Sequence, residues 1–140
     1  MKVFLSYATS DRPSATLLAT EFRSAGLEVW DPVSEVLPGD NWASQIGKAL
    51  ESSDAMVVLL SPEALSSPSV KGDIAYALGS LNYENRLIPV VVRPVKQIPW
   101  ILNRLDVVDA ADLNQSVQVI VSRLLKGGYQ GKKQRARAAG

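Results

Sequence analysis

The chain has 140 residues, 46% of them hydrophobic, and a formal net charge of +1, which fits one domain around a single core. It contains no histidine and no cysteine, so we expect no metal site, no disulfide and no catalysis by Ser-His-Asp or Cys-His groups. No apolar run reaches the ~18–20 residues of a membrane-spanning helix, and the N-terminus lacks a signal-peptide layout. We therefore expect a cytoplasmic protein without membrane contact.

Strand and helix patterns alternate through the first half of the chain. Residues 2–7 (KVFLSY) predict a strand, and apolar residues at helical spacing predict a helix from Asp11 to Gly26, with Pro13 in its first turn. Residues 27–30 predict a second strand, and the prolines and glycine that follow it predict a loop. The next helix is expected to turn four residues inward: Trp42, Ile46, Ala49 and Leu50.

The second half continues this alternation. Residues 55–60 (AMVVLL) form an unbroken apolar run, which is typical of a central strand buried on both faces of a parallel sheet. Residues 87–92 (LIPVVV) predict a fourth strand, and residues 106–109 predict a weaker fifth one. The helix before the fourth strand is expected to face inward through Val70, Ile74, Ala77, Leu78 and Leu81. The closing helix is expected to do so through Val117, Ile120, Val121, Leu124 and Leu125.

The order of these elements predicts an α/β fold. We expect a flavodoxin-like, doubly wound, five-stranded parallel sheet with helices on both faces. Ligands of such sheets bind beyond the carboxyl ends of the strands. The site should therefore be built from residues 6–11, 31–42 and 61–73.

Charge divides the chain into a body and a tail. Five of the fifteen basic residues lie in residues 126–140, where no acid occurs, so residues 1–125 carry a net charge of −4. A mildly acidic body makes nucleic-acid binding by the globular part improbable. We interpret residues 1–126 as the domain and residues 127–140 as a flexible basic tail or a linker to another domain or protein. Contact of the tail with nucleic acid or an anionic membrane is the alternative interpretation.

Three segments at the predicted strand ends resemble the Toll/interleukin-1 receptor (TIR) domain family, in its bacterial-type members. They are VFLSYATSD, similar to the box of the family's first strand, VWDPVSEVLPGDNW, similar to its second strand and BB loop, and VVLLSPEAL, similar to its central strand. The resemblance covers residues 2–125. It implies a five-stranded parallel sheet, and either cleavage of NAD, as a substrate and not a prosthetic group, or assembly through the BB loop.

The resemblance implies that Asp73 is the catalytic residue. Enzymatic members carry a pattern like Ser-x-Trp-x-x-x-Glu-Ile-x-x-Ala-Leu, and here Asp73 falls at the Glu position while Ser69 falls where the Trp is expected. Breaking the bond between nicotinamide and ribose builds positive charge on the sugar, which a carboxylate can stabilise. Aspartate is one methylene shorter, and a displacement of about 1 Å can cost on the order of 100-fold in rate. The alternative is a solvated carboxylate stabilised by the helix dipole.

Five further residues are candidates for binding NAD. Tyr7 is expected to stack on a ring of the ligand or to be part of the core, and the backbone groups of Ala8 and Thr9 to contact NAD. Asp31 is expected to bond ligand hydroxyls or to cap the loop, and Trp42 to cover the nucleotide or to pack in the core. A neighbouring pair, Asp11 and Arg12, is expected to form a helix cap and a surface ion pair and not to be catalytic.

The BB-loop segment Val36, Leu37, Pro38 and Gly39 presents apolar groups on a conformationally restricted loop, which predicts a contact site for self-association. The alternative is that Val36 and Leu37 fold back onto the core. The resemblance further implies that association activates NAD cleavage, as a glycohydrolase or cyclase, in immune or anti-phage signalling. The main alternative function is a catalytically silent TIR adaptor or scaffold.

Two other families share the sheet plan. A receiver domain of a two-component system requires acids after its first and third strands, where this chain has Ser6-Tyr7 and Ser61-Pro62. A nucleoside deoxyribosyltransferase, which also attacks an N-glycosidic bond with a carboxylate, stays an alternative enzyme.

Overall fold

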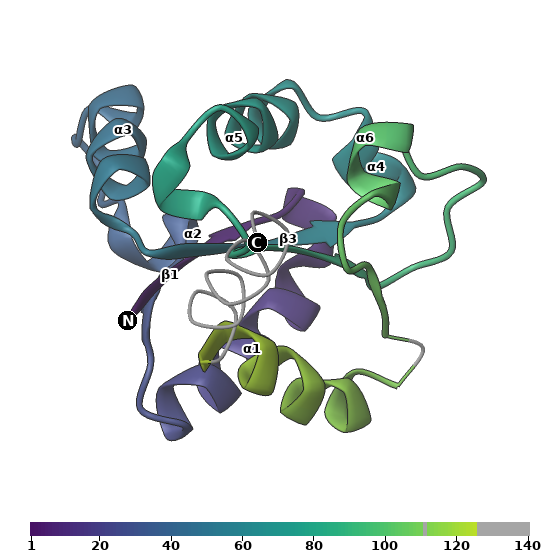
Figure 1. Ribbon diagram of the computed structural model, residues 1–140. Helices are drawn as coiled ribbons and strands as arrows, with labels where there is room; N and C mark the ends of the chain where they lie inside the picture. The colour runs from purple at the N-terminus through teal and green to yellow at the C-terminus, as the bar shows by residue number, and fades with distance from the viewer. Residues whose placement is uncertain (111, 126–140) are drawn as a thin grey trace, which may run out of the picture.

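Five parallel strands form one sheet in the order β2-β1-β3-β4-β5 (Figure 1). The computed structural model describes residues 1–110 and 112–125, so the predicted tail at 127–140 lies outside the described residues. The strands are β1 (Lys2–Ser6), β2 (Glu28–Trp30), β3 (Ala55–Leu60), β4 (Leu87–Val91) and β5 (Val108–Asp109). The predicted five-stranded, doubly wound fold is confirmed.

Helices connect the strands in chain order. They are η1 (Thr9–Asp11), α1 (Arg12–Ser24), α2 (Pro32–Glu35), α3 (Trp42–Ser52), α4 (Pro62–Leu65), α5 (Pro68–Leu78), η2 (Leu81–Tyr83) and α6 (Trp100–Asn103). Residues 113–125 are also helical and are called the C-terminal helix. No helix within residues 1–110 and 112–125 has the length and apolar character needed to cross a membrane.

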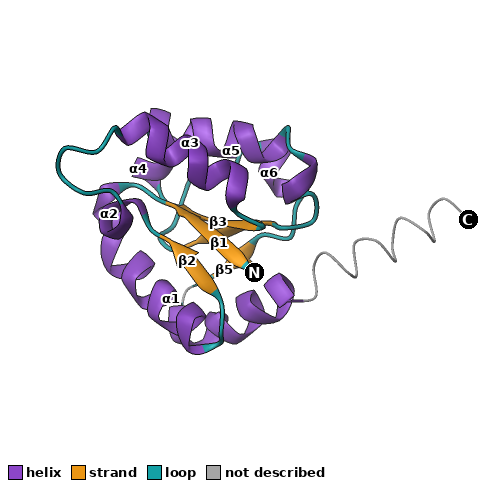
Figure 2. Ribbon diagram, turned by 90° about the vertical axis from the view of Figure 1, so that its left-hand side faces the viewer, coloured by secondary structure: helices purple, strands orange, loops and turns teal. Residues whose placement is uncertain are grey.

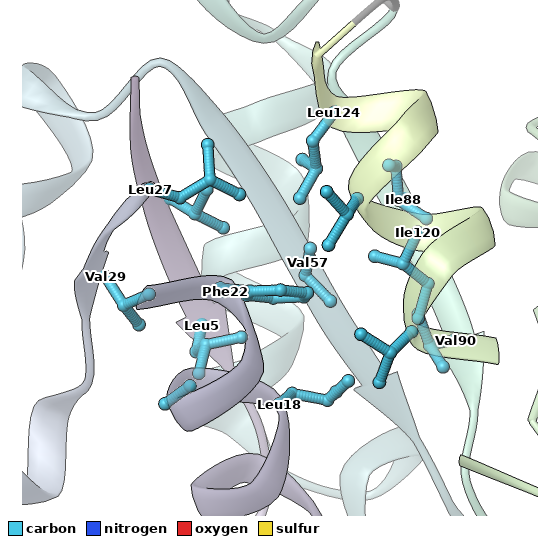
Figure 3. Packing of buried hydrophobic residues seen from close by; sticks show 14 of the residues in the cluster. Leu5, Leu18, Phe22, Leu27, Val29, Val57, Ile88, Val90, Ile120 and Leu124 are labelled. Atoms are coloured by element: carbon cyan, nitrogen blue, oxygen red, sulfur yellow. The ribbon is translucent and has the colours of Figure 1, made fainter. Parts of the chain in front are cut away.

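Each face of the sheet carries its own hydrophobic core. Figure 2 shows α1 and the C-terminal helix on one face and α3, α4, α5 and α6 on the other. The first cluster joins the sheet to α1 and the C-terminal helix, and Figure 3 shows its main members: Leu5, Leu18, Phe22, Val57, Ile88, Val90, Ile120 and Leu124. The second cluster joins the sheet to the opposite helices, and its large members include Phe4, Trp30, Met56, Leu60, Val70, Tyr83 and Leu102. All six residues of β3 are fully buried, as their apolar run predicts.

Several residues predicted to point inward are exposed. Trp42 is 49% exposed because it is the first residue of α3, ahead of the buried positions Ala49 and Leu50. Leu78 is 42% exposed at the end of α5, and Leu81 is 86% exposed at the start of η2, a separate short helix. The prediction was wrong for these residues because Trp42 and Leu78 are the end residues of their helices and Leu81 lies beyond the end of α5. Leu125 is likewise exposed, while its neighbour Leu124 is fully buried.

Candidate functional site

The last residue of β1 and the residue after it direct polar side chains to opposite faces of the sheet. Successive residues of a strand alternate between faces, and accordingly Tyr7 packs against the first cluster while Phe4 belongs to the second. Ser6 therefore faces the side covered by α5, and its hydroxyl donates a hydrogen bond of 2.8 Å to Asp73 Oδ2. Two separate polar contacts thus begin at adjacent residues, one to Asp73 and one to Asp31.

Asp73 lies on the inward side of α5 and is not turned out to water. It is three residues after Val70 and four before Ala77, both of which are buried in the second cluster, so all three share one side of the helix. The helix begins at Pro68, and the hydroxyl of Ser67 caps it by accepting from the amide of Val70. A carboxyl group is thereby held in largely apolar surroundings at the end of β1.

Burial changes the acidity of this carboxyl. Desolvation raises the pKa of Asp73 from its ordinary value of 3.8 to about 6, and the hydrogen bond from Ser6 opposes that rise. A carboxyl group with a pKa near neutrality can exchange a proton at physiological pH, which a general acid or base requires. The structure thus brings Asp73 together with Ser6, a partner that the sequence analysis placed in the site region without giving it a role.

Tyr7 and Asp31 contact each other. The Tyr7 hydroxyl donates to Asp31 Oδ1 at 2.5 Å, and the same oxygen accepts from the amide of Val33 at 3.0 Å. Asp31 is 4% exposed and caps α2, where Pro32 occupies the first helical position. Desolvation, followed by the hydrogen bond to Asp31, raises the pKa of Tyr7 far above its ordinary range, so its hydroxyl stays a donor. The capping role expected for Asp31 is present.

A third polar cluster joins the carboxyl ends of β1, β3 and β4. Asp11 is 3% exposed; its Oδ2 accepts from the Ser61 hydroxyl at 2.5 Å and its Oδ1 accepts from Arg93 Nε at 2.9 Å. The other guanidinium nitrogens of Arg93 donate to Glu63, and one of them also donates to Ser10. Hydrogen bonds to Glu63 and Asp11 raise the pKa of Arg93, and the bond from Arg93 lowers the pKa of Glu63.

This cluster corrects the expectation for Asp11. Its side chain makes no cap hydrogen bond, and its ion pair is with Arg93 and is buried on the Asp11 side, not a surface pair with Arg12. Arg93 lies 82 residues away in the chain, so no local pattern indicates the pair. The one available indication was that Asp11, Ser61 and Arg93 all follow strands, at the edge where parallel strands end.

The remaining predicted ligand contacts lie around the same edge but do not meet Asp73 directly. Ala8 is partly buried against the second cluster, and its carbonyl oxygen accepts from the Asp11 amide. Thr9 is exposed at the start of η1. Trp42 lies at the start of α3 with about half of its side chain exposed. Of these groups, Thr9 and Trp42 are exposed to solvent, whereas the Ala8 carbonyl already accepts a hydrogen bond.

The BB-loop segment divides between surface and core. Val36 is partly buried against the second cluster, whereas Leu37 is 62% exposed. A turn follows, in which Leu37 N donates to Asp40 Oδ2 at 2.8 Å and Asp40 N donates to Leu37 O at 3.0 Å. Gly39 has a φ of 91°, which L side chains rarely adopt. The loop therefore has a defined shape that presents Leu37 to solvent.

A pocket that the sequence analysis missed lies at the ends of β4 and β5. It has a volume of about 710 Å³, and its lining includes Arg93, Lys96, Trp100, Asn103 and Asp109. Trp100 is 70% exposed at the start of α6. The pocket is assembled from residues 91–110, whereas Asp73 is carried by α5 and contacts β1.

Comparison with known proteins agrees with the fold. The sequence profile of the TIR domain matches residues 3–125. The chain is similar to the TIR domain of the Toll-related receptor TRR-2 from Hydra magnipapillata, with a TM-score of 0.72 and 24% identity over 89% of this chain and 94% of that one. It is also similar to a metazoan TIR-STING receptor from C. gigas in complex with 2',3'-cGAMP, with a TM-score of 0.75 and 24% identity over 87% of this chain and 38% of that one.

A more distant likeness is to a 2-deoxyribosyltransferase from Bacillus psychrosaccharolyticus, with a TM-score of 0.58 and 13% identity over 84% of this chain and 90% of that one. No curated protein sequence matches the chain. At these identities the solved structures show the fold alone. The family profile, by contrast, spans nearly all of the described residues. The chain belongs to the TIR domain family.

Proposed function

We propose that the chain cleaves NAD between nicotinamide and ribose and is activated by self-association. The observation that carries this proposal is Asp73, whose carboxyl group is held at the end of β1 by Ser6 and has a pKa of about 6. Its position in the chain is the one at which enzymatic members of the resembled family carry glutamate. An acidic group in apolar surroundings interacts strongly with a developing positive charge.

The chemistry needs one carboxylate. The bond between ribose C1' and the nicotinamide nitrogen breaks, and its electron pair stays on that nitrogen, which becomes neutral. Positive charge then develops on the sugar, where the Asp73 carboxylate stabilises it. Water adds to C1', and its proton passes to the carboxylate, which gives ADP-ribose. A pKa of about 6 leaves Asp73 mostly ionised at pH 7.5 yet able to accept that proton.

Other residues would hold the ligand. We propose that the backbone of Ala8 and Thr9 and the exposed ring of Trp42 contact NAD, because Ala8 and Thr9 follow β1, Trp42 follows the BB loop, and Thr9 and Trp42 are exposed. The ring of Tyr7 is half-buried against the first cluster, and its hydroxyl is bonded to Asp31, so this hydroxyl is not assigned a contact with the ligand.

The test is nicotinamide release by the purified chain, at high concentration or clustered on beads. We expect Asp73→Asn to lower turnover by about 100-fold or more, and Asp73→Glu to keep or raise it by restoring the longer reach. Asp106→Asn, an exposed carboxyl near β5, is the matched control and should behave as wild type. Turnover that survives Asp73→Asn would contradict the proposal. Parallel incubation with a deoxynucleoside and a free base reports any deoxyribosyl transfer.

A catalytically silent adaptor is the second candidate, favoured by one observation: Leu37 stands 62% exposed on a turn of fixed shape. TIR domains interact with one another, which fits self-association through this loop. A chain that associates yet releases no nicotinamide when clustered, even as Asp73→Glu, would establish this function in place of the enzyme.

A further inference from the structure

The base of the BB loop is attached to the sheet by a side-chain contact. Backbone pairing between β1 and β2 ends at Phe4 and Trp30. Beyond that pair the two strands have no further backbone pairing. The Tyr7 hydroxyl donates to Asp31, the first residue after β2. This hydrogen bond therefore connects the two segments beyond the last backbone pair, three residues after Phe4 and one residue after Trp30.

Asp31 also caps the amino end of α2. Its Oδ1 accepts from the Val33 amide, and its carbonyl oxygen accepts from Ser34 and Glu35. Pro32 contributes no donor, so these bonds to Asp31 satisfy the first amides of the helix. Because one oxygen serves both Tyr7 and Val33, the direction of α2 depends on where Tyr7 holds the carboxylate.

The α2 turn leads directly into the segment that presents Leu37. Val36 N donates to Pro32 O at 3.2 Å, and the Leu37–Asp40 turn follows at once. A single turn of helix has few contacts of its own with which to hold its direction. The charge-assisted bond from Tyr7, which is partly buried, is a contact from outside the helix that holds its start.

Burial also leaves little of Asp31 accessible to a ligand. The side chain is buried, and its partner Tyr7 packs against the first cluster, on the face of the sheet opposite to the one that carries Asp73. Both residues are thus oriented toward each other and not toward the candidate catalytic carboxyl group.

We propose that Tyr7 and Asp31 form a positioning pair that holds α2, and with it residues 36–40, in the conformation that offers Leu37 to a second copy of the chain. This inference rests on the proposed self-association. It replaces the expectation that Asp31 bonds ligand hydroxyls, and it gives the Tyr7 hydroxyl a partner within the chain. Its consequences appear in the protein without ligand, which a role in NAD recognition does not predict.

The test compares backbone hydrogen exchange and self-association of ligand-free variants. In Tyr7→Phe we expect the amides of Val33, Glu35 and Val36 to exchange about tenfold faster, and the dissociation constant of self-association to rise about tenfold, since a hydrogen bond to a buried carboxylate is lost. Core amides of β3 should be unchanged. Tyr76→Phe, a tyrosine that is 38% exposed on α5, is the matched control.

Substitution at Asp31 gives a graded second measurement. Asp31→Asn keeps an oxygen that can accept from Tyr7 and Val33, so it should lie closer to wild type than Tyr7→Phe. Asp31→Ala removes both bonds and should exceed it. This order separates positioning from ligand recognition, because all of these variants are compared without ligand.

Loop exchange that stays at the wild-type rate in a folded Tyr7→Phe would overturn the inference, as would unchanged self-association despite a faster-exchanging loop. A wild-type chain that stays monomeric would overturn it too. If the chain releases no nicotinamide but shows the expected exchange and association, the enzymatic proposal fails and the positioning pair stands.

Discussion

The carboxyl group of Asp73 combines two conflicting properties: it is charged at neutral pH, and it lies on the buried side of α5 between Val70 and Ala77. Its pKa of about 6, above 3.8, means that the folded chain binds its proton more tightly than the unfolded chain does. Stability from this group is therefore greatest below pH ~4 and falls as the pH rises through about 6. The folded state tolerates the charge at an energetic cost that a role in chemistry would explain.

Asp73→Asn should remove this pH dependence. The variant carries no charge to desolvate, and the Ser6 hydroxyl can still donate to the amide oxygen. Relative to wild type, we expect its free energy of unfolding to gain up to about 3 kcal/mol between pH 4 and pH 7.5, from a shift of about two pKa units. Urea unfolding of both proteins across this range measures the difference, and a pH-independent difference would contradict the assigned pKa.

Ser6→Ala should raise the pKa of Asp73. The hydrogen bond from Ser6 lowers the pKa of this carboxyl, so its loss should raise the pKa above about 6. Titration of the carboxyl carbon by NMR measures the midpoint, with Ser69→Ala, an exposed serine of the same helix, as the control. A midpoint that does not rise would mean that the serine does not bond the charged form.

The residues of the site were predictable only in part. The resemblance placed Asp73 correctly on a helix after the central strand, but its contact with Ser6 spans 67 residues of chain. The ion pair predicted for Asp11 was wrong for the same reason. Its partner Arg93 is remote in sequence and comes close to Asp11 only after the sheet forms. Local patterns predict which residues lie at the strand ends, whereas side-chain pairs depend on the assembled sheet.

At the scale of the elements, Ser61 lies between β3 and α4 and makes two structural hydrogen bonds. The hydroxyl of Ser61 donates to Asp11 and accepts from the amide of Ala64, thereby capping α4, and the side chain is fully buried. This contact ties the carboxyl end of β3 to that of β1.

Ser61→Ala should therefore destabilise the chain by about 1–3 kcal/mol, because it removes a cap and a donor to a buried carboxylate. Thermal or urea unfolding measures the loss, and Ser66→Ala, an exposed serine just after α4, should change it by less than about 0.5 kcal/mol. Equal stability of both variants would show that water replaces the hydroxyl at Asp11.

Element positions followed from the sequence better than element ends did. The apolar runs of β3 and β4 and the spacing of α1 and the C-terminal helix are properties of continuous segments, and the structure has them where they were expected. Short elements were missed: α2 lies inside a segment predicted as loop, because its formation depends on the Asp31 cap and Pro32. A single helical turn has no periodicity from which to be predicted.

At the scale of the whole molecule, strand order explains why function would concentrate at one edge. With β1 and β3 adjacent in the sheet and β2 on the outside, the chain leaves β1 toward β2 on one side and β3 toward β4 on the other. Connections therefore diverge beyond β1 and β3, which is where open parallel sheets bind ligands. Asp73, Asp11 and Asp31 are each bonded to a residue at the end of β1 or β3.

The same edge carries the loop that we propose for association, so assembly and NAD cleavage should fail together when Leu37 is altered. Leu37→Asp should leave stability within about 0.5 kcal/mol of wild type, because the side chain is 62% exposed. It should keep the chain monomeric at concentrations where wild type associates, and it should remove the rise of nicotinamide release with protein concentration, since a charge placed in an apolar contact stays unpaired. Sedimentation velocity and the turnover assay measure the two effects.

Leu81→Asp is the control, because it adds the same charge at a more exposed leucine. Leu81 is 86% exposed and precedes β4, at the opposite edge of the sheet, so this variant should change neither association nor turnover. Association and turnover that both survive Leu37→Asp would assign the contact to another surface, whereas lost association with full turnover would show that a single chain completes its own active site.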